Sequence, residues 1–259
     1  MTSTPATHSP GFAPELAVAG RIATITLRRP EIANRLEPDD LEMLRGFIRD
    51  VNARPDVLVL QLCAEGRHFC AGFNIGSLAD GGAGARFEAL ANELEHARPV
   101  TIAAINGGVY GGATDLALAC DFRIGVDTSQ MFVPAARLGL LFYRGGLQRY
   151  VSRLGLSVAK RLLLTAATFD AAQMQACGFL DAVVAPAELR EEVARWSDEL
   201  AGMAPLALLG MKKHLNRIAC GALDEHAFQR DVARADASLD LREGARAWKE
   251  KRKPVFRGE

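Results

Sequence analysis

The apolar and polar positions in the first part of the chain change their period, and each period predicts a different element. From Glu15 to Leu27 the chain alternates and is rich in β-branched residues, which predicts two strands that turn at Ala19-Gly20. Between Glu37 and Val51 the apolar residues recur at helical spacing. Residues 57–63 form a continuous apolar run, as expected of a strand that is buried on both faces.

A second cycle of helix and strand follows. The pattern predicts a helix from Phe87 to Ala97, a strand from Val100 to Ile105, a glycine-rich turn from Gly107 to Gly112, a buried helix from Ala113 to Cys120 and a strand from Phe122 to Val126. Strands that alternate with helices in this way predict an α/β core.

After Gly145 the pattern is helical almost to the end of the chain. One short strand is expected at Ala182 to Val184, and helices are expected at 157–165, 170–177, 187–202, 206–219, 223–238 and 242–252. No repeat, low-complexity stretch or long linker is evident. We therefore predict a flexible N-terminal arm over residues 1–14, an α/β core over 15–200 and a helical C-terminal region over 201–259.

Composition excludes several classes of protein. Lys plus Arg equals Asp plus Glu at 31 each, which removes the electrostatic case for a nucleic-acid surface. The five cysteines form no C-x-x-C pair, which argues against a disulfide framework and for a reducing compartment. We expect a cytoplasmic protein with no membrane partner, because neither a signal peptide nor a long apolar run is evident. The histidines lack metal-ligand spacing, so no metal is expected.

Two turns are candidates for chemistry. Residues Phe69 to Ile75 (F-C-A-G-F-N-I) come directly after the first buried strand, and Gly107 to Gly112 come after the next and open a helix. Glycine lets the backbone approach another group closely. A helix N-terminus adds free N–H donors and partial positive charge, so such a place suits a developing oxyanion.

Turn chemistry alone leaves other interpretations open. Tight packing of strand against helix is the more common reason for glycines at such a turn. A phosphate-binding loop is another candidate, but the sequence contains neither G-x-x-x-x-G-K-[ST] nor G-x-G-x-x-G.

Several segments, in order and with suitable gaps, carry a resemblance to a known family. They are I-T-L-R-R-P-E-I-A-N-R-L (25–36), F-C-A-G-F-N-I (69–75), G-G-A-T-D-L-A-L-A-C-D (111–121), F-V-P-A-A-R-L-G-L (132–140), G-G-L-Q-R (145–149), F-D-A-A-Q-M-Q-A-C-G-F-L-D-A-V-V (169–184) and W-K-E-K-R-K-P-V-F (248–256). These segments resemble the signature blocks of the enoyl-CoA hydratase/isomerase (crotonase) family over nearly the whole chain from Leu16 onward.

The resemblance implies a fold and an oxyanion site. The expected fold is α/β, a crotonase-like spiral of ββα units with a helical C-terminal region that assembles trimers, often paired into hexamers. The expected oxyanion hole consists of the backbone N–H groups of Phe73 and Gly112, which would hold the thioester enolate. Two fixed donors of this kind contribute several kcal/mol at the transition state.

The acid–base residues depart from the family pattern. Hydratases of the family hold a water between two glutamates, and the matching positions here are Asp115 and Ala135. Asp115 is a catalytic candidate, although an aspartate in the first turn of a helix also suits capping and the helix dipole. Ala135 cannot transfer a proton.

Neighbours of Ala135 supply other candidates. Tyr143 is a second catalytic candidate, because a tyrosine can donate a proton or orient a carboxylate, and decarboxylating relatives place a tyrosine near here. Arg144 is a candidate to bind substrate. Phe73 and Phe142 would make the acyl pocket apolar. Core packing for the aromatic residues and solvent exposure for Arg144 are the alternatives.

The resemblance also implies contacts to coenzyme A, which enters as part of the substrate, so no separate cofactor is expected. Backbone contacts would come from Glu31, Ile32, Ala33 and Ala71. In relatives, an aromatic residue and a lysine on the C-terminal helix of a neighbouring subunit reach the CoA, and they match Trp248 and Lys251.

We therefore predict an enzyme that transforms an acyl-CoA thioester, hydratase-like in its reaction and with an atypical acid–base set. A double-bond isomerase and an acyl-CoA decarboxylase are the alternatives within the family. The alternative of another class is a family member that binds CoA esters without turnover, which Ala135 favours and the retention of Gly112 and Asp115 disfavours.

Overall fold

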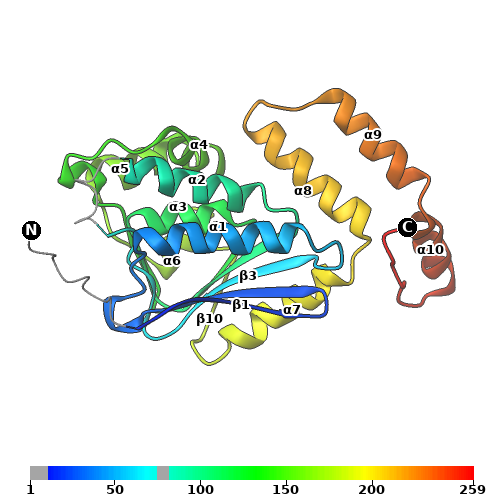
Figure 1. Ribbon diagram of the computed structural model, residues 1–259, viewed down its shortest axis with the longest axis horizontal. Helices are drawn as coiled ribbons and strands as arrows, with labels where there is room; N and C mark the ends of the chain where they lie inside the picture. Colours follow the sequence, from blue (N-terminus) through cyan, green and yellow to red (C-terminus); the bar gives the residue numbers. More distant parts are fainter. Residues whose placement is uncertain (1–10, 75–81) are drawn as a thin grey trace, which may run out of the picture.

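The longest strands form one six-stranded sheet in the order β1-β2-β3-β5-β7-β10. The computed structural model describes residues 11–74 and 82–259, and Figure 1 shows the sheet beneath helices α1 and α3. Neighbouring strands are parallel except for β1 and β2. The bounds are β1 Phe12–Ala19, β2 Ile22–Arg28, β3 Val59–Ala64, β5 Val100–Ile105, β7 Phe122–Val126 and β10 Ala182–Val184.

The expected hairpin at the start of the chain is present, with a turn at Gly20, whose φ is 56°. It begins earlier than expected. Residues 12–14 belong to β1, so the prediction of a flexible arm is wrong for this part of 1–14, and residues 1–10 lie outside the described residues. A register shift between Phe12 and Glu15 breaks the alternation at the start of β1, which explains why the pattern did not indicate a strand there.

A second, four-stranded sheet has the order β4-β6-β8-β9. Its strands are β4 His68–Cys70, β6 Gly108–Tyr110, β8 Gln130–Phe132 and β9 Phe169–Asp170. β4, β6 and β8 each follow a long strand of the first sheet, and each precedes a helix in the chain. This repeated ββα unit confirms the crotonase-like spiral, although no sequence repeat announces it.

The glycine-rich segment 107–112 is more than the turn that was predicted, because its middle is strand β6, parallel to β4 and β8. Glycines allow this close strand packing. A Cβ on Gly107 would lie 2.0 Å from the Arg67 carbonyl oxygen, and one on Gly108 would overlap the Tyr110 ring. Glycines stand on both sides of its three residues and favour a turn, which explains why the strand was not predicted.

Helices cover both faces of the large sheet. α1 (Pro38–Asn52), α2 (Ala83–Glu95) and α3 (Gly112–Ala119) lie on one face and α7 (Leu189–Ala201) on the other (Figure 1). α1 begins at a capping box in which Asp40 accepts from the Glu37 N–H at 2.9 Å. All six residues of β5 are buried, because both helical layers pack against it.

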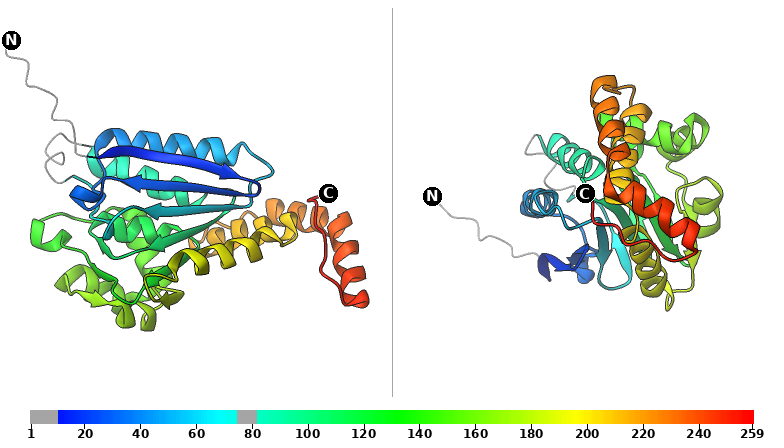
Figure 2. Two further views of the ribbon diagram at one scale, coloured as in Figure 1. Left: turned by 90° about the horizontal axis from the view of Figure 1, so that it is seen from below. Right: turned by 90° about the vertical axis from the view of Figure 1, so that its right-hand side faces the viewer.

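The second half of the described chain is mostly helical, as expected. The remaining elements are η1 Pro30–Ile32, η3 Ala135–Leu138, α4 Arg144–Leu154, α5 Leu156–Thr165, α6 Ala171–Ala176, α8 Pro205–Ala219, α9 Glu225–Asp236 and α10 Leu239–Glu250. Helices α8 to α10 extend from one end of the core (Figures 1 and 2). Lys212 joins α8 to the core by an ion pair with Asp121 at 2.7 Å. None of the helices in the described ranges is long and apolar enough to span a bilayer.

Candidate active site

The two turns that the sequence singles out touch each other. Gly72 follows β4 with a φ of +87°, a conformation that favours glycine. A Cβ on Gly72 would lie 2.9 Å from the Tyr110 carbonyl oxygen and 3.1 Å from the Gly112 backbone nitrogen. The absence of a side chain therefore lets the first turn reach the N-terminus of α3.

Gly112 forms this contact, and Phe73 directly follows Gly72 in the chain. Leu36 N–H donates to the Gly72 carbonyl at 2.8 Å, and Asn74 N–H donates to the Leu36 carbonyl at 3.0 Å. Because successive residues of an extended segment point to opposite sides, the N–H of Phe73 points away from Leu36. Gly112 is the first residue of α3, where the helix has no acceptor for the N–H. Among the described residues neither N–H has a hydrogen-bond acceptor.

The loop expected to contact CoA lies beside the first turn. Glu31 and Ile32 are in η1, and Ala33, with a φ of 54°, accepts from the Ala71 N–H at 2.8 Å. The buried Asn34, also at positive φ, donates 2.8 Å hydrogen bonds to the carbonyls of Glu65 and His68. The structure thus brings Ala33 and Ala71 together. The side chain of Asn34, which sequence reasoning missed, links the two loops by hydrogen bonds.

Asp115 is buried, with 0% exposure, and is fully paired. Arg149 Nε donates to its Oδ1 at 2.8 Å and Arg149 Nη2 donates to its Oδ2 at 2.7 Å. The Tyr143 phenol also donates to Oδ2, at 2.6 Å. The bidentate guanidinium compensates the buried carboxylate and occupies both of its oxygens.

Tyr143 keeps its proton in this environment. Burial, then the charge of Asp115 and the hydrogen bond to it, raises the pKa of Tyr143 well above its ordinary value. The phenol is therefore protonated at neutral pH, and its O–H is held in one orientation by Asp115.

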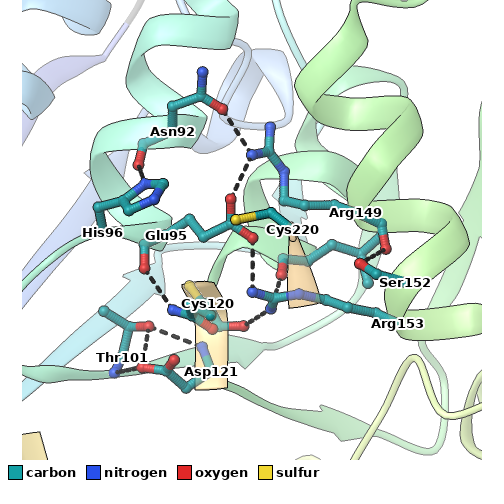
Figure 3. A network of polar contacts seen from close by, with 12 residues as sticks. Asn92, Glu95, His96, Thr101, Cys120, Asp121, Arg149, Ser152, Arg153 and Cys220 are labelled. Atoms are coloured by element: carbon teal, nitrogen blue, oxygen red, sulfur yellow. Dashed lines mark hydrogen bonds and ion pairs between the residues drawn. The ribbon is translucent and has the colours of Figure 1, made fainter. Parts of the chain in front are cut away.

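Arg149 is the most important residue that sequence reasoning left without a role. Burial lowers the pKa of its guanidinium, and Asp115 and Glu95 together more than offset this, so the pKa lies above its ordinary value. Arg149 Nη1 also donates to Asn92 Oδ1 at 2.8 Å and to Glu95 Oε2 at 3.0 Å (Figure 3). Its spacing of three positions from Gly146, on the buried face of α4, was the available signal.

An aromatic wall lines the contact between the turns and Tyr143. The Phe87 ring lies 6.4 Å from that of Phe73 and 6.3 Å from that of Tyr143, between ring centroids. A Cβ on Gly112 would meet Phe87 Cζ at 3.0 Å. Phe87 was expected only as part of a helix. Phe142 stacks on Tyr143 at 4.7 Å and is itself buried in the core.

The position of the second glutamate is filled by a small apolar residue. Ala135 opens η3 and is buried. The preceding Pro134 lies near Gly111, since its Cδ is 3.9 Å from the place of a Cβ there. Arg144 is exposed at the start of α4, and its guanidinium meets no acceptor within the part of the chain that the structure describes.

Trp248 and Lys251 lie apart from these residues within one chain. Trp248 is 88% exposed on α10, and Lys251 caps that helix with a φ of 53°. α10 stands at the tip of the C-terminal arm, away from α2, α3 and α4 (Figures 1 and 2). A contact from these residues to CoA therefore remains a prediction about a neighbouring subunit.

A separate cavity of about 760 Å³ lies between the core and α8. Phe73, Gly112, Asp115 and Tyr143 do not line it, whereas Glu95 does. In the described ranges no group of three or more His, Cys, Asp or Glu side chains is placed to hold a metal.

Comparison with known proteins identifies the family. The profile described as "Enoyl-CoA hydratase/isomerase" matches residues 18–259. A probable enoyl-CoA hydratase of Mycobacterium tuberculosis is 31% identical over 91% of this chain and 94% of its own length. Carnitinyl-CoA dehydratase of Proteus mirabilis is 30% identical, over 94% and 97%. The crystal structure of an enoyl-CoA hydratase/isomerase family protein from Hyphomonas neptunium matches with a TM-score of 0.88 at 27% identity, over 96% and 98%. The chain belongs to the enoyl-CoA hydratase/isomerase family.

Proposed function

We propose that this chain transforms an acyl-CoA thioester by stabilising its enolate with the N–H groups of Phe73 and Gly112. The observation that carries the proposal is the contact between Gly72, which directly precedes Phe73, and the Gly112 nitrogen. Among the described residues neither the Phe73 N–H nor the Gly112 N–H has an acceptor. Fixed donors at a developing oxyanion require no reorganisation during the reaction, so they lower its barrier. The names of the relatives support a CoA-ester substrate and hydratase- or dehydratase-like chemistry.

Tyr143 is proposed as the group that carries the proton. Its phenol is protonated at neutral pH and borders the aromatic wall beside Gly112. Asp115 then acts as a fixed acceptor that orients the phenol, because both of its oxygens already accept from Arg149. Of the two catalytic candidates from the sequence, this assignment gives the proton to Tyr143 and makes Asp115 the residue that positions it.

The full pairing of Asp115 and the apolar Ala135 favour a second candidate, a reaction with one proton carrier. Decarboxylation releases CO₂ from Cα, and the enolate that remains takes one proton there, which the phenol can supply. Double-bond isomerisation first removes a proton from Cα, which the protonated phenol cannot accept, and then returns one to Cγ. Neither requires two carboxylates around a water. Assays of crotonyl-CoA hydration, 3-enoyl-CoA isomerisation and methylmalonyl-CoA decarboxylation separate these reactions.

We also propose a homotrimer, or a dimer of trimers, in which Trp248 and Lys251 reach the CoA of a neighbouring subunit. Exposed apolar side chains along the arm support an interface: Met211, Leu215 and Ile218 on α8 and Leu239, Leu241 and Trp248 on α10. Lysine suits a CoA phosphate as a point charge.

The oxyanion proposal is tested with Gly112→Pro and its control Gly112→Ala. Both add a Cβ against Phe87, but only proline removes the N–H, and proline is tolerated at the first position of a helix. We expect exchange of the α-protons of butyryl-CoA with solvent deuterium to be about 10²- to 10³-fold slower in the proline variant than in the alanine variant.

Binding of free CoA, measured by calorimetry, should be equal in the two variants, since free CoA has no thioester carbonyl. Equal exchange rates in the folded variants would overturn the oxyanion assignment. If the unaltered protein binds acyl-CoA but neither exchanges α-protons nor turns over any member of the panel, it is a binding module.

A further inference from the structure

Two arginines one helical turn apart on α4 hold the two ends of α3. Arg149 makes a bidentate contact with Asp115 in the first turn of α3. Arg153 Nη1 donates to the carbonyl of Leu118 and, at 2.6 Å, to that of Cys120, at the last turn. A cation at the C-terminal carbonyls of a helix suits its dipole and satisfies groups that lack helical donors.

Glu95 at the end of α2 joins the two arginines. Arg149 Nη1 donates to its Oε2 at 3.0 Å, and Arg153 Nη2 donates to its Oε1 at 3.0 Å. Figure 3 shows the Glu95 carboxylate between the two guanidinium groups. Two arginines thus face two carboxylates, Asp115 and Glu95, so the charges of these four groups balance.

The helix held in this way has little of its own to fix it. α3 has eight residues, and its N-cap, Gly111, makes no side-chain capping bond. Isolated helices of this length are unstable, so packing and polar contacts decide its position. Its first turn carries both Gly112 and Asp115, so a shift of α3 would move both groups at once.

We propose that Arg149, Arg153 and Glu95 form a clamp that positions α3 so that the Gly112 N–H and the Asp115-held phenol of Tyr143 meet the substrate together. The inference rests on the proposed function. Arg153 lies 18% exposed and contacts none of the candidate catalytic groups, so its role is positioning. Arg149 positions Asp115 in the same way, because its guanidinium remains protonated.

The test compares Arg153→Gln, Arg153→Lys and Arg149→Lys with a matched control, Arg195→Gln. Arg195 also pairs with two glutamates, but it is exposed on α7, on the opposite face of the sheet from the clamp (Figure 1). Lysine at position 149 keeps the charge against Asp115 but cannot replace a bidentate guanidinium, so this variant avoids an uncompensated buried carboxylate.

Two readouts are measured on each folded variant: the α-proton exchange rate of butyryl-CoA and backbone hydrogen–deuterium exchange of residues 112–120. We expect Arg153→Gln to slow the α-proton exchange about tenfold and Arg149→Lys about a hundredfold, since a small misplacement of reacting groups has effects of this size. Arg153→Lys should recover part of the rate. Free CoA affinity should not change, and α3 should exchange its amide hydrogens faster in the clamp variants only.

A purely structural role would lower the melting temperature and leave the rate per folded molecule unchanged. The clamp is overturned if folded Arg153→Gln and Arg149→Lys match Arg195→Gln in rate and in α3 exchange. If the unaltered protein catalyses nothing, the proposed function fails, and α3 exchange still decides the clamp: faster exchange in its variants supports it, and unchanged exchange overturns it.

Discussion

The phenol of Tyr143 and the carboxylate of Asp115, 28 positions apart in the chain, share a hydrogen bond of 2.6 Å. Asp115 comes from the first turn of α3, and Tyr143 is the N-cap residue of α4. The bond therefore spans two consecutive ββα units. It holds the Tyr143 hydroxyl in one orientation at a place where the resemblance implies a carboxylate pair in hydratases.

The first prediction concerns Tyr143→Phe. This change removes the hydroxyl that carries the proton in the proposal, and it keeps the ring against Phe87 and Phe142. We expect turnover of the best acyl-CoA substrate to fall about 10²- to 10⁴-fold, with the affinity for free CoA unchanged. Steady-state kinetics and calorimetry measure the two quantities.

Tyr150→Phe is the matched control for that change. Its hydroxyl is buried and shares a hydrogen bond with Thr114, outside the proposed proton path. We expect this variant to lose about 1 kcal/mol of stability and to keep its turnover. Full turnover by folded Tyr143→Phe would remove Tyr143 from the mechanism.

The second prediction is a pH dependence. Burial and then the charge of Asp115 raise the pKa of both Tyr143 and Tyr150 above the ordinary value. The folded protein thus holds these protons at a pH where the unfolded chain has released them. The contribution of the two phenols to the free energy of unfolding is fully present below about pH 10, which is their pKa in the unfolded chain. As the pH rises further, the free energy of unfolding falls by about 1.4 kcal/mol per pH unit for each phenol.

Ultraviolet titration of phenolate in this protein of three tyrosines measures the effect. Asp115→Asn removes the negative charge, so it should lower the pKa of both buried phenols, and Tyr143→Phe identifies which phase belongs to Tyr143. Phenol titration that is identical with and without the Asp115 charge would contradict the electrostatic account.

The third prediction tests the close approach of the two turns. Gly72→Ala places a Cβ 2.9 Å from the Tyr110 oxygen at a φ of +87°. Gly178→Ala has a similar φ of +78° but nothing within 4 Å, so it measures the backbone cost alone. We expect about 1–2 kcal/mol of destabilisation at Gly178, more at Gly72, and slower α-proton exchange only at Gly72.

Chemical denaturation gives the two stabilities, and deuterium incorporation into butyryl-CoA gives the rates. Equal losses of stability in both variants, with unchanged exchange, would mean that the first turn can move away from α3 without consequence.

The sequence allowed the large elements to be predicted because their patterns are long. β5 and α1 lie within a residue or so of the ranges that periodicity indicated. Strands β4, β6, β8 and β9 were missed, because segments of two or three residues carry little periodic signal and these pair with partners distant in the chain. The equally short β10 was predicted at its observed bounds, Ala182–Val184.

The site was predictable where glycine or a signature block marks it. Gly72 and Gly112 could be singled out because a side chain at either position would collide with its neighbours. The pairing of Asp115 with Arg149 could not be derived, because it depends on how α4 packs on α3. Helical spacing places Arg149 on a buried face but names no partner for it.

The abutment of Gly72 on the first residue of α3 is a relation between main-chain atoms. Side chains that touch neither this contact nor the clamp of Arg149, Arg153 and Glu95 can therefore be exchanged during evolution without moving the two proposed donors. A lineage in which Ala135 replaced a carboxylate would lose the reaction that needs that carboxylate. It would keep the contact between the two turns, on which a different reaction could then evolve. In this architecture the backbone geometry can be inherited while the acid–base side chains, and with them the reaction, change.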